Sequence, residues 1–182
     1  MFRHLSLLLL APLLALAGLA APAAMAATPA AVTSVALPNS MASTGDSITR
    51  GYDATSSGCF LADCPQYSWS TGTSTVNSHY QRLLAANPQI SGHVYNDAKT
   101  GAKMTALDAQ VTTAAGQGVQ YLTVMMGAND VCTSSRATMT PTATFESQFQ
   151  TALTDFFAAD PNAHVFLSSI PNVYQLWSVL HT

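Results

Sequence analysis

The stretch that decides the fold is MASTGDSIT, residues 41–49, a short strand-like run that breaks at Gly45. Two residues after the glycine, Ser47 stands where a helix could begin. A hydroxyl at the carboxyl end of a strand lies in the positive field of helix N–H groups, where a developing negative charge is stabilised. Ser47 is therefore the leading candidate for a nucleophile.

Strand and helix patterns alternate along the rest of the chain. Short β-prone or apolar runs predict strands, and apolar residues at helical spacing predict helices. The strands are expected at residues 41–44, 93–97, 120–126 and 164–170. The helices are expected at 76–87, from 104 to a stop at Gly116 and Gly118, at 145–156 and at 173–180. This alternation predicts an α/β fold with a parallel sheet covered by helices on both faces.

Polar residues and glycines follow three of the predicted strands. Ser47 follows the first, residues 97–101 follow the second, and residues 127–130 follow the third. Because α/β folds place their sites at the carboxyl ends of the strands, we expect these three loops to converge on one edge of the sheet.

The first 26 residues have the layout of a secretory signal peptide. Arg3 precedes a leucine-rich run at residues 5–19, and small residues end the segment at Ala26, where cleavage is expected. A transmembrane anchor is the alternative, but the apolar run is interrupted and shorter than about 20 residues. We therefore expect a secreted, extracellular protein without a stable membrane anchor.

The remaining chain is expected to hold a leader at residues 27–39 and one domain at 40–182. Without Arg3 it has five Lys and Arg against nine Asp and Glu, one basic residue fewer than the six of the full chain. This acidic balance does not favour nucleic acid or an anionic membrane as a partner. A small-molecule or lipid substrate and a monomeric state at full length are the expectations.

The three cysteines fit an exported protein. Cys59 and Cys64 enclose four residues and could close a small disulfide loop in an oxidising compartment. A metal site is the alternative, although no second pair of Cys or His at ligand spacing accompanies them. Cys132 is left over, which indicates a free thiol, a partner on another chain, or a partner in a missing part of the protein.

Acyl transfer by a serine needs a nucleophile, a base and preorganised donors for the oxyanion. Ser47 supplies the hydroxyl, and its own backbone N–H could act as a donor. The backbone N–H of Gly101 and the side-chain amide of Asn129 are further candidate donors, because each stands in a loop expected at the same sheet edge. These residues could supply the nucleophile and the oxyanion donors that acyl transfer needs.

Three blocks of the chain resemble the GDSL or SGNH hydrolases. Gly45–Ile48 resembles the first block, Gly101 resembles the glycine of the second, and Gly127–Asp130 resembles the third, Gly-x-Asn-Asp. The likeness is closest to secreted actinobacterial-type esterases and lipases. It implies a three-layer flavodoxin-like fold, truncated here after about four strands, and carboxylic-ester hydrolysis through an acyl-enzyme on Ser47. It also implies an oxyanion hole with Gly101 and Asn129, and no metal or cofactor.

The family's fourth block, an Asp-x-x-His that supplies the base, is absent. The residues three positions before the candidate histidines His79, His93, His164 and His181 are Val76, Ile90, Pro161 and Ser178. We therefore expect no general base in this chain and predict impaired activity, with the missing part of the domain beyond Thr182. The apolar helix expected at 173–180 then has nothing to cover it.

Several residues have two interpretations. Asp46 and Asp130 are expected to support the loops through hydrogen bonds rather than to titrate in catalysis. Tyr67 and Trp69 could line an acyl or alcohol pocket, or form a local core of their loop. The alternative function is a noncatalytic secreted binding domain. Within the enzyme class, a polysaccharide deacetylase or a phospholipase is the alternative to a simple esterase.

Overall fold

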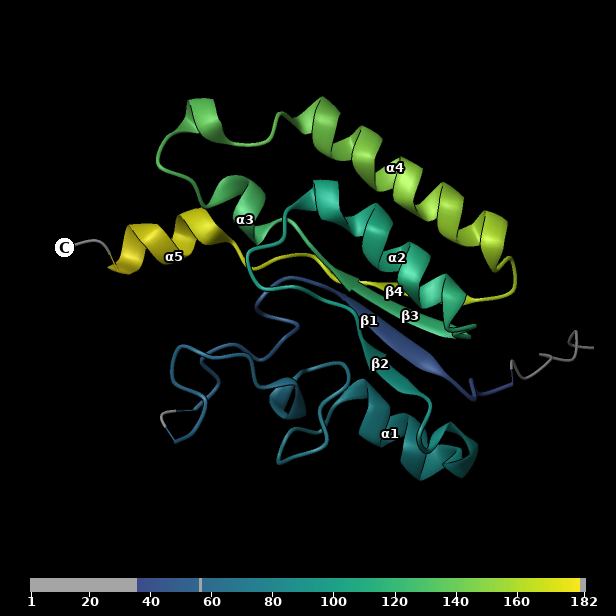
Figure 1. Ribbon diagram of the computed structural model, residues 1–182. Helices are drawn as coiled ribbons and strands as arrows, with labels where there is room; N and C mark the ends of the chain where they lie inside the picture. The colour runs from purple at the N-terminus through teal and green to yellow at the C-terminus, as the bar shows by residue number, and fades with distance from the viewer. Residues whose placement is uncertain (1–35, 56, 181–182) are drawn as a thin grey trace, which may run out of the picture. The chain divides into compact units, whose positions relative to one another are not determined.

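The computed structural model describes residues 36–55 and 57–180, so the expected signal peptide and most of the expected leader lie outside the described residues. Four strands form one sheet: β1 (Met41–Gly45), β2 (Val94–Asn96), β3 (Tyr121–Met125) and β4 (His164–Leu167). Their order is β2-β1-β3-β4, and every neighbouring pair is parallel (Figure 1). The predicted parallel sheet is confirmed, with the flavodoxin-like order of its first four strands.

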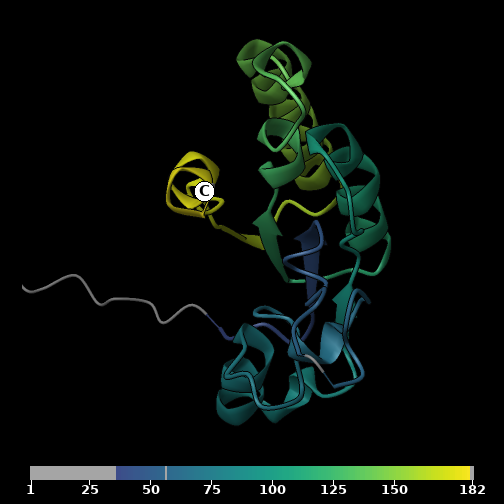
Figure 2. The ribbon, with the colours of Figure 1, turned by 90° about the vertical axis from the view of Figure 1, so that its left-hand side faces the viewer.

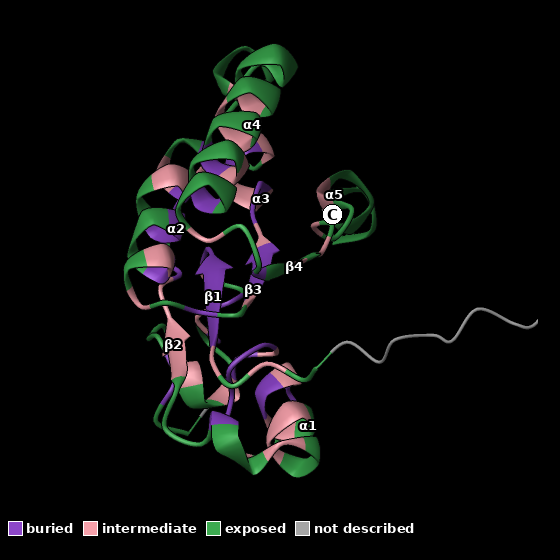
Figure 3. Cartoon of the chain, turned by 90° about the vertical axis from the view of Figure 1, so that its right-hand side faces the viewer, coloured by how far each residue is buried: buried purple, intermediate pink, exposed green. Residues whose placement is uncertain are grey.

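Helices cover both faces of the sheet. The α-helices are α1 (His79–Ala86), α2 (Leu107–Gly116), α3 (Ala128–Val131), α4 (Thr142–Ala159) and α5 (Val173–Leu180). Short 3₁₀ turns lie at Pro65–Tyr67, Pro88–Ile90, Met104–Ala106 and Arg136–Thr138. The helices α2 and α4 lie together on one face and α1 lies on the other, which gives three layers (Figures 1 and 3).

The core is divided between the two faces because side chains alternate along each strand. On the face of α2 and α4, the buried cluster includes Ala42, Leu107, Leu122, Val124 and Phe156. A smaller cluster on the α1 face contains Met41, Tyr80 and Ile90. Because both faces of β1 and β3 are covered, these two strands form the buried centre of the sheet (Figure 3).

The first helix begins three residues later than the apolar pattern indicated. We expected a helix from Val76, but α1 begins at His79 because the Ser78 hydroxyl caps it by accepting a hydrogen bond from Gln81 N at 3.1 Å. The helix ends at Ala86, and Asn87 then caps the 3₁₀ turn that starts at Pro88. Side-chain capping, rather than apolar spacing, therefore sets where this helix begins.

The fourth strand is shorter than predicted. We expected it to reach Ile170, but β4 ends at Leu167, and Ser168 N makes the last bond toward β3, to Val124 O at 2.9 Å. No described strand pairs with the outer side of β4, so Phe166 and Leu167 are 41% and 55% exposed. The prediction failed because β3 ends at Met125, so the residues after Ser168 have no backbone of β3 to pair with.

The last helix lies apart from the sheet. Its residues from Tyr174 to Leu180 are all exposed, and Figure 2 shows α5 separated from the other elements. The expected uncovered apolar helix is thus present in the described part of the chain. Within residues 36–55 and 57–180, no helix is both long and apolar enough to cross a membrane.

Candidate active site

Three loops leave the carboxyl ends of β1, β2 and β3. Asp46 and Ser47 directly follow β1, Gly101 follows β2, and Ala128–Val131 forms the short helix α3 after β3. Since β1 lies between β2 and β3 and all three strands are parallel, the loops emerge at the same edge of the sheet (Figure 1). The topology therefore places the predicted site residues at one edge, as α/β folds require.

Gly45 fixes the direction in which the chain leaves β1. Its φ is +146°, and a Cβ at this position would lie 2.4 Å from Met125 O and 2.5 Å from Thr49 Oγ1. The buried Gln110 side chain accepts a hydrogen bond from Gly45 N at 2.7 Å and donates one to Gly45 O at 3.0 Å. A single amide group thus holds both backbone atoms of the residue that starts the serine turn.

A tight turn follows around Ser47. The backbone of Arg50 donates to Asp46 O at 3.1 Å, and Tyr52 N donates to Ser47 O at 3.0 Å. The Asp46 carboxylate accepts a hydrogen bond from Ile48 N at 2.9 Å. Ser47 itself is partly buried, and its backbone is fixed by the turn.

Asp46 is a buried carboxylate with an unusual environment. Burial raises the pKa of Asp46 above its ordinary value, and the negative charge of Asp130 adds to this effect, while the bond from Ile48 N opposes it. One oxygen, Oδ2, is buried without a hydrogen-bond partner in the described part of the chain. The position beside Ser47 therefore holds a negative charge only at a cost in free energy.

The three loops are tied to one another by hydrogen bonds. Lys99 N donates to Gly45 O at 3.1 Å, which joins the second loop to the first. Asn129 Nδ2 donates to Ala102 O at 2.9 Å, and Asp130 accepts from Met104 N at 2.9 Å, which join the third loop to the second. Asp130 also accepts from the Thr140 hydroxyl at 2.6 Å. Asp46 therefore accepts a hydrogen bond from the backbone of its own turn, and Asp130 accepts hydrogen bonds from two neighbouring loops.

The two candidate oxyanion donors differ in their surroundings. Gly101 is exposed, has φ of +79°, and a Cβ built there would meet nothing within 4 Å. Asn129 is partly buried, and its amide is oriented by the bond to Ala102 O. An amide nitrogen carries two N–H groups, so this bond leaves one for another acceptor.

The described histidines lie toward the opposite end of the sheet. His93 immediately precedes β2, and His164 is the first residue of β4. His79 Nδ1 lies 2.9 Å from the hydroxyl of Tyr121, the first residue of β3. Four residues of strand rise separate Tyr121 from the carboxyl end of β3, or about 13 Å. His181 lies outside the described residues.

His79 belongs to an aromatic cluster. Its ring lies 5.3 Å from that of Trp69 and 4.7 Å from that of Phe166, measured between centroids. Burial lowers the pKa of His79, and the positive charge of Arg82 contributes in the same direction. Trp69 also donates from Nε1 to Thr49 Oγ1 at 3.3 Å. The Trp69 ring also lies 6.3 Å from that of Phe166, so Trp69 packs within this local aromatic cluster.

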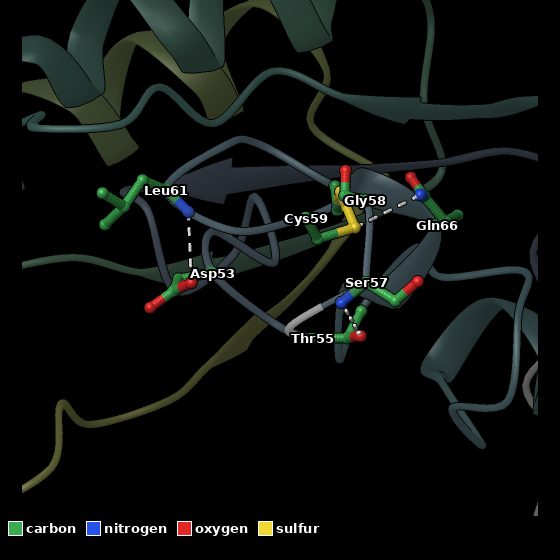
Figure 4. Close-up of a disulfide and its surroundings, with 8 residues drawn as sticks. Asp53, Thr55, Ser57, Gly58, Cys59, Leu61 and Gln66 are labelled. Atoms are coloured by element: carbon green, nitrogen blue, oxygen red, sulfur yellow. Dashed lines mark hydrogen bonds between the residues drawn. A yellow bond between two sulfur atoms is a disulfide. The ribbon is translucent and has the colours of Figure 1, made fainter.

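A disulfide closes the loop that follows the serine turn. Cys59 and Cys64 are bonded, which confirms the pairing that their spacing indicated (Figure 4). Arg50 forms an ion pair with Asp63, with Nε and Oδ2 3.1 Å apart, and the Thr100 hydroxyl donates to the same carboxylate. The disulfide loop is thus fastened to the turn after Ser47 and to the residue before Gly101.

An apolar hollow of about 710 Å³ lies beside the third loop. Gly127 and Asp130 line it together with apolar side chains of the sheet and of α4, including Val124, Phe145 and Phe149. Cys132, just beyond α3, is an exposed free thiol. Within the described residues, no cluster of three or more His, Cys, Asp or Glu is placed to hold a metal ion.

Comparison with known families agrees with this arrangement. The model of the GDSL-like Lipase/Acylhydrolase family matches residues 44–181, which include all three loops. The chain belongs to this family. Its membership supports ester-type hydrolase chemistry in general. No curated protein sequence matches the chain.

Sequence reasoning missed the partner that organises the first block of the GDSL family. Gln110 lies 65 residues from Gly45, in the middle of α2, and it is buried. A glutamine in a helix between apolar residues has no local pattern that identifies its partner. The only available signal was a polar residue at a buried helical position.

Proposed function

We propose that this protein is a secreted carboxylic-ester hydrolase that acts through an acyl-enzyme on Ser47. The observation that carries this proposal is the serine turn after β1, which Gln110 holds through both backbone atoms of Gly45. The loops of Gly101 and Asn129 emerge at the same edge and are hydrogen-bonded to their neighbours in the site. Family membership supports the reaction class.

In the proposed reaction, Ser47 Oγ attacks the ester carbonyl carbon and loses its proton to a base. The carbonyl oxygen becomes an oxyanion that accepts hydrogen bonds from Ser47 N, Gly101 N and the free N–H of Asn129 Nδ2. The alcohol leaves with a proton as the tetrahedral intermediate collapses to the acyl-enzyme. Water then attacks the acyl carbon, which releases the carboxylic acid and restores the Ser47 hydroxyl.

None of the three described histidines lies at the end of the sheet that carries Ser47, where a general base is needed. His93 and His164 lie at the amino ends of β2 and β4, and His79 lies in α1 beside the amino end of β3. The sequence lacks Asp-x-x-His. In serine proteases, loss of a triad member leaves only about 10³ to 10⁴ of rate enhancement over water. We therefore propose slow turnover for this sequence of 182 residues.

Two measurements test the nucleophile. The first is hydrolysis of p-nitrophenyl acetate by the chain, by Ser47→Ala, and by Ser57→Ala as a control at an exposed serine of the next loop. The second is covalent labelling with a fluorophosphonate, mapped by mass spectrometry. We expect labelling at Ser47, its loss in Ser47→Ala, and slower labelling in Asn129→Ala. Labelling elsewhere, or none at all in the folded chain, would contradict the proposal.

A noncatalytic secreted binding domain is the second candidate function. The placement of the described histidines favours it, because a site with none of them at its end of the sheet could bind an ester and fail to cleave it. This candidate predicts that a slowly hydrolysed ester binds equally well to the chain and to Ser47→Ala, with no labelling by the fluorophosphonate. Hydrolysis assays with an acetylated polysaccharide and with a phospholipid distinguish the candidate esters.

A further inference from the structure

Two large apolar side chains stand exposed at the end of the disulfide loop. Phe60 is 68% exposed and Leu61 is 61% exposed, and both lie between the bonded cysteines Cys59 and Cys64. In Figure 4 the Leu61 side chain points away from the disulfide. We refer to Phe60 and Leu61 as the tip.

The loop holds the tip in a defined conformation. Besides the disulfide, Leu61 N donates to the Asp53 carboxylate at 3.1 Å, and Asp53 N donates to Ala62 O at 3.1 Å (Figure 4). Leu61 has a φ of +50°, which a residue with a side chain adopts only where its surroundings hold it. The exposure of the tip is therefore a property of a constrained loop.

The base of the same loop is fastened to the proposed active site. Asp63 bonds Arg50, three residues after Ser47, and accepts from Thr100, which precedes Gly101. Cys64 N also donates to Arg50 O at 3.1 Å. The base of the loop that carries the tip is thus held next to the serine edge.

The size of the tip argues against a protein partner. A stable protein interface buries about 800 Å² on each side, whereas two side chains supply a small fraction of that area. Partial insertion of two apolar side chains into a lipid surface needs no matching groove and is favourable in proportion to the apolar area removed from water. A fluid lipid surface is the partner that fits such a small protrusion.

The charges around the tip indicate the kind of lipid. Arg50 and Asp63 neutralise each other as an ion pair, and Asp53 is the remaining carboxylate that contacts the loop. The segment therefore has no unpaired basic group to attract anionic headgroups. This favours a zwitterionic lipid surface.

We propose that the tip inserts into zwitterionic lipid surfaces and places the Ser47 edge against them. The adsorption itself does not require catalysis. The role of adsorption, which is to bring lipid esters to the site, rests on the proposed esterase function.

The test is partitioning of the folded protein onto phosphatidylcholine vesicles, measured by co-sedimentation. The tip variant is Phe60→Ser/Leu61→Ser. The matched control is Phe157→Ser/Leu37→Ser, which removes an exposed Phe and an exposed Leu near the other end of the sheet, where α4 ends and β1 begins. We expect the tip variant to partition at least about tenfold more weakly and the control to match the unmodified chain. Circular dichroism checks that every variant is folded.

The exposed helix α5 is the competing lipid-binding element. It is identical in the tip variant, the control and the unmodified chain, so its contribution does not change between them. If α5 alone bound the vesicles, the tip variant would partition like the unmodified chain, which would overturn the proposal. An equal loss in the control variant would overturn it as well, because it would indicate general apolar adsorption.

Two further measurements separate the proposal from the function on which it rests. The Ser47→Ala variant should adsorb normally, and the tip variant should label with the fluorophosphonate as fast as the unmodified chain. If the unmodified chain adsorbed to vesicles but was not labelled, the proposed esterase function would be refuted and the proposed lipid binding would stand. Partitioning that falls steeply between about 0.05 and 0.5 M salt, or that needs anionic lipid, would contradict apolar insertion.

Discussion

Two regions of the sheet are built differently: the carboxyl end of β1, which carries Ser47, and the edge formed by β4 with α5. At the carboxyl end of β1, a buried amide, two aspartates and backbone bonds between three loops fix the serine turn. On the β4 side, the strand is unpaired on its outer edge and α5 exposes its apolar residues to solvent. The proposed site is therefore held by contacts within the described chain, while the β4 side contributes little to it. Substitutions on the two sides should differ in their effects accordingly.

The largest effect is expected at Gly45. Gly45→Ala places a Cβ against Met125 O, a backbone atom that cannot rotate away, at a φ that suits glycine. We expect the free energy of unfolding to fall by about 4 kcal/mol or more. Urea unfolding measures this. The control is Gly92→Ala, also at positive φ but with nothing near its Cβ, which should cost about 1 kcal/mol. Equal losses would mean that close approach to Met125 is unimportant.

The second effect is expected at Gln110. Gln110→Leu keeps the volume but removes the partner of buried Gly45 N, and it leaves Gly45 O with the bond from Lys99 N alone. We expect a loss of about 2–3 kcal/mol in unfolding free energy and slower labelling of Ser47 by a fluorophosphonate. Gln150→Leu, on the exposed side of α4, is the control and should change neither measurement. A fully stable Gln110→Leu variant would show that the serine turn does not depend on this amide.

A smaller effect involves pH and the His79 cluster. Burial and then the charge of Arg82 lower the pKa of His79 in the folded state. The unfolded chain therefore binds this proton more readily, and stability should fall as pH decreases through the ordinary histidine pKa of about 6.5. The raised pKa values of Asp46 and Asp97 act in the opposite direction in acid.

The contribution of His79 is the difference in pH dependence between the unmodified chain and His79→Gln, measured by urea unfolding from about pH 7.5 to 5.5. We expect the variant to lose less stability on acidification. His93→Gln, at an exposed histidine, is the control. Parallel curves for all three proteins would refute the assignment of this pH dependence to His79.

The smallest effect on stability is expected in α5. Leu176 is 57% exposed, so Leu176→Ala should change the free energy of unfolding by no more than about 0.5 kcal/mol and should reduce self-association. Leu107→Ala is the matched substitution at a fully buried leucine and should cost about 2–5 kcal/mol. Thermal unfolding and sedimentation velocity measure the two properties. A large loss of stability in Leu176→Ala would mean that α5 packs against the domain in solution.

The sequence predicted what depends on local patterns. Alternating strands and helices predicted the parallel sheet, and the spacing of Cys59 and Cys64 predicted their disulfide. Boundaries were less accurate, because the Ser78 cap determines where α1 begins and the end of β3 determines where β4 ends. The role of Gln110 could not be predicted, because it depends on a contact with Gly45 that the tertiary structure alone creates.

The position of β1 between β2 and β3 has a consequence for synthesis of the chain. Gln120 N donates to Ser40 Oγ across 80 residues, and each residue of β1 pairs with one of β3. At a translation rate of about 5–20 residues per second, β3 is made roughly 4 to 16 seconds after β1. During that interval the ribosome-bound chain has the nucleophile segment but not the ladder that positions it. Residues 41–45 can therefore complete their pairing only after Tyr121–Met125 has been made.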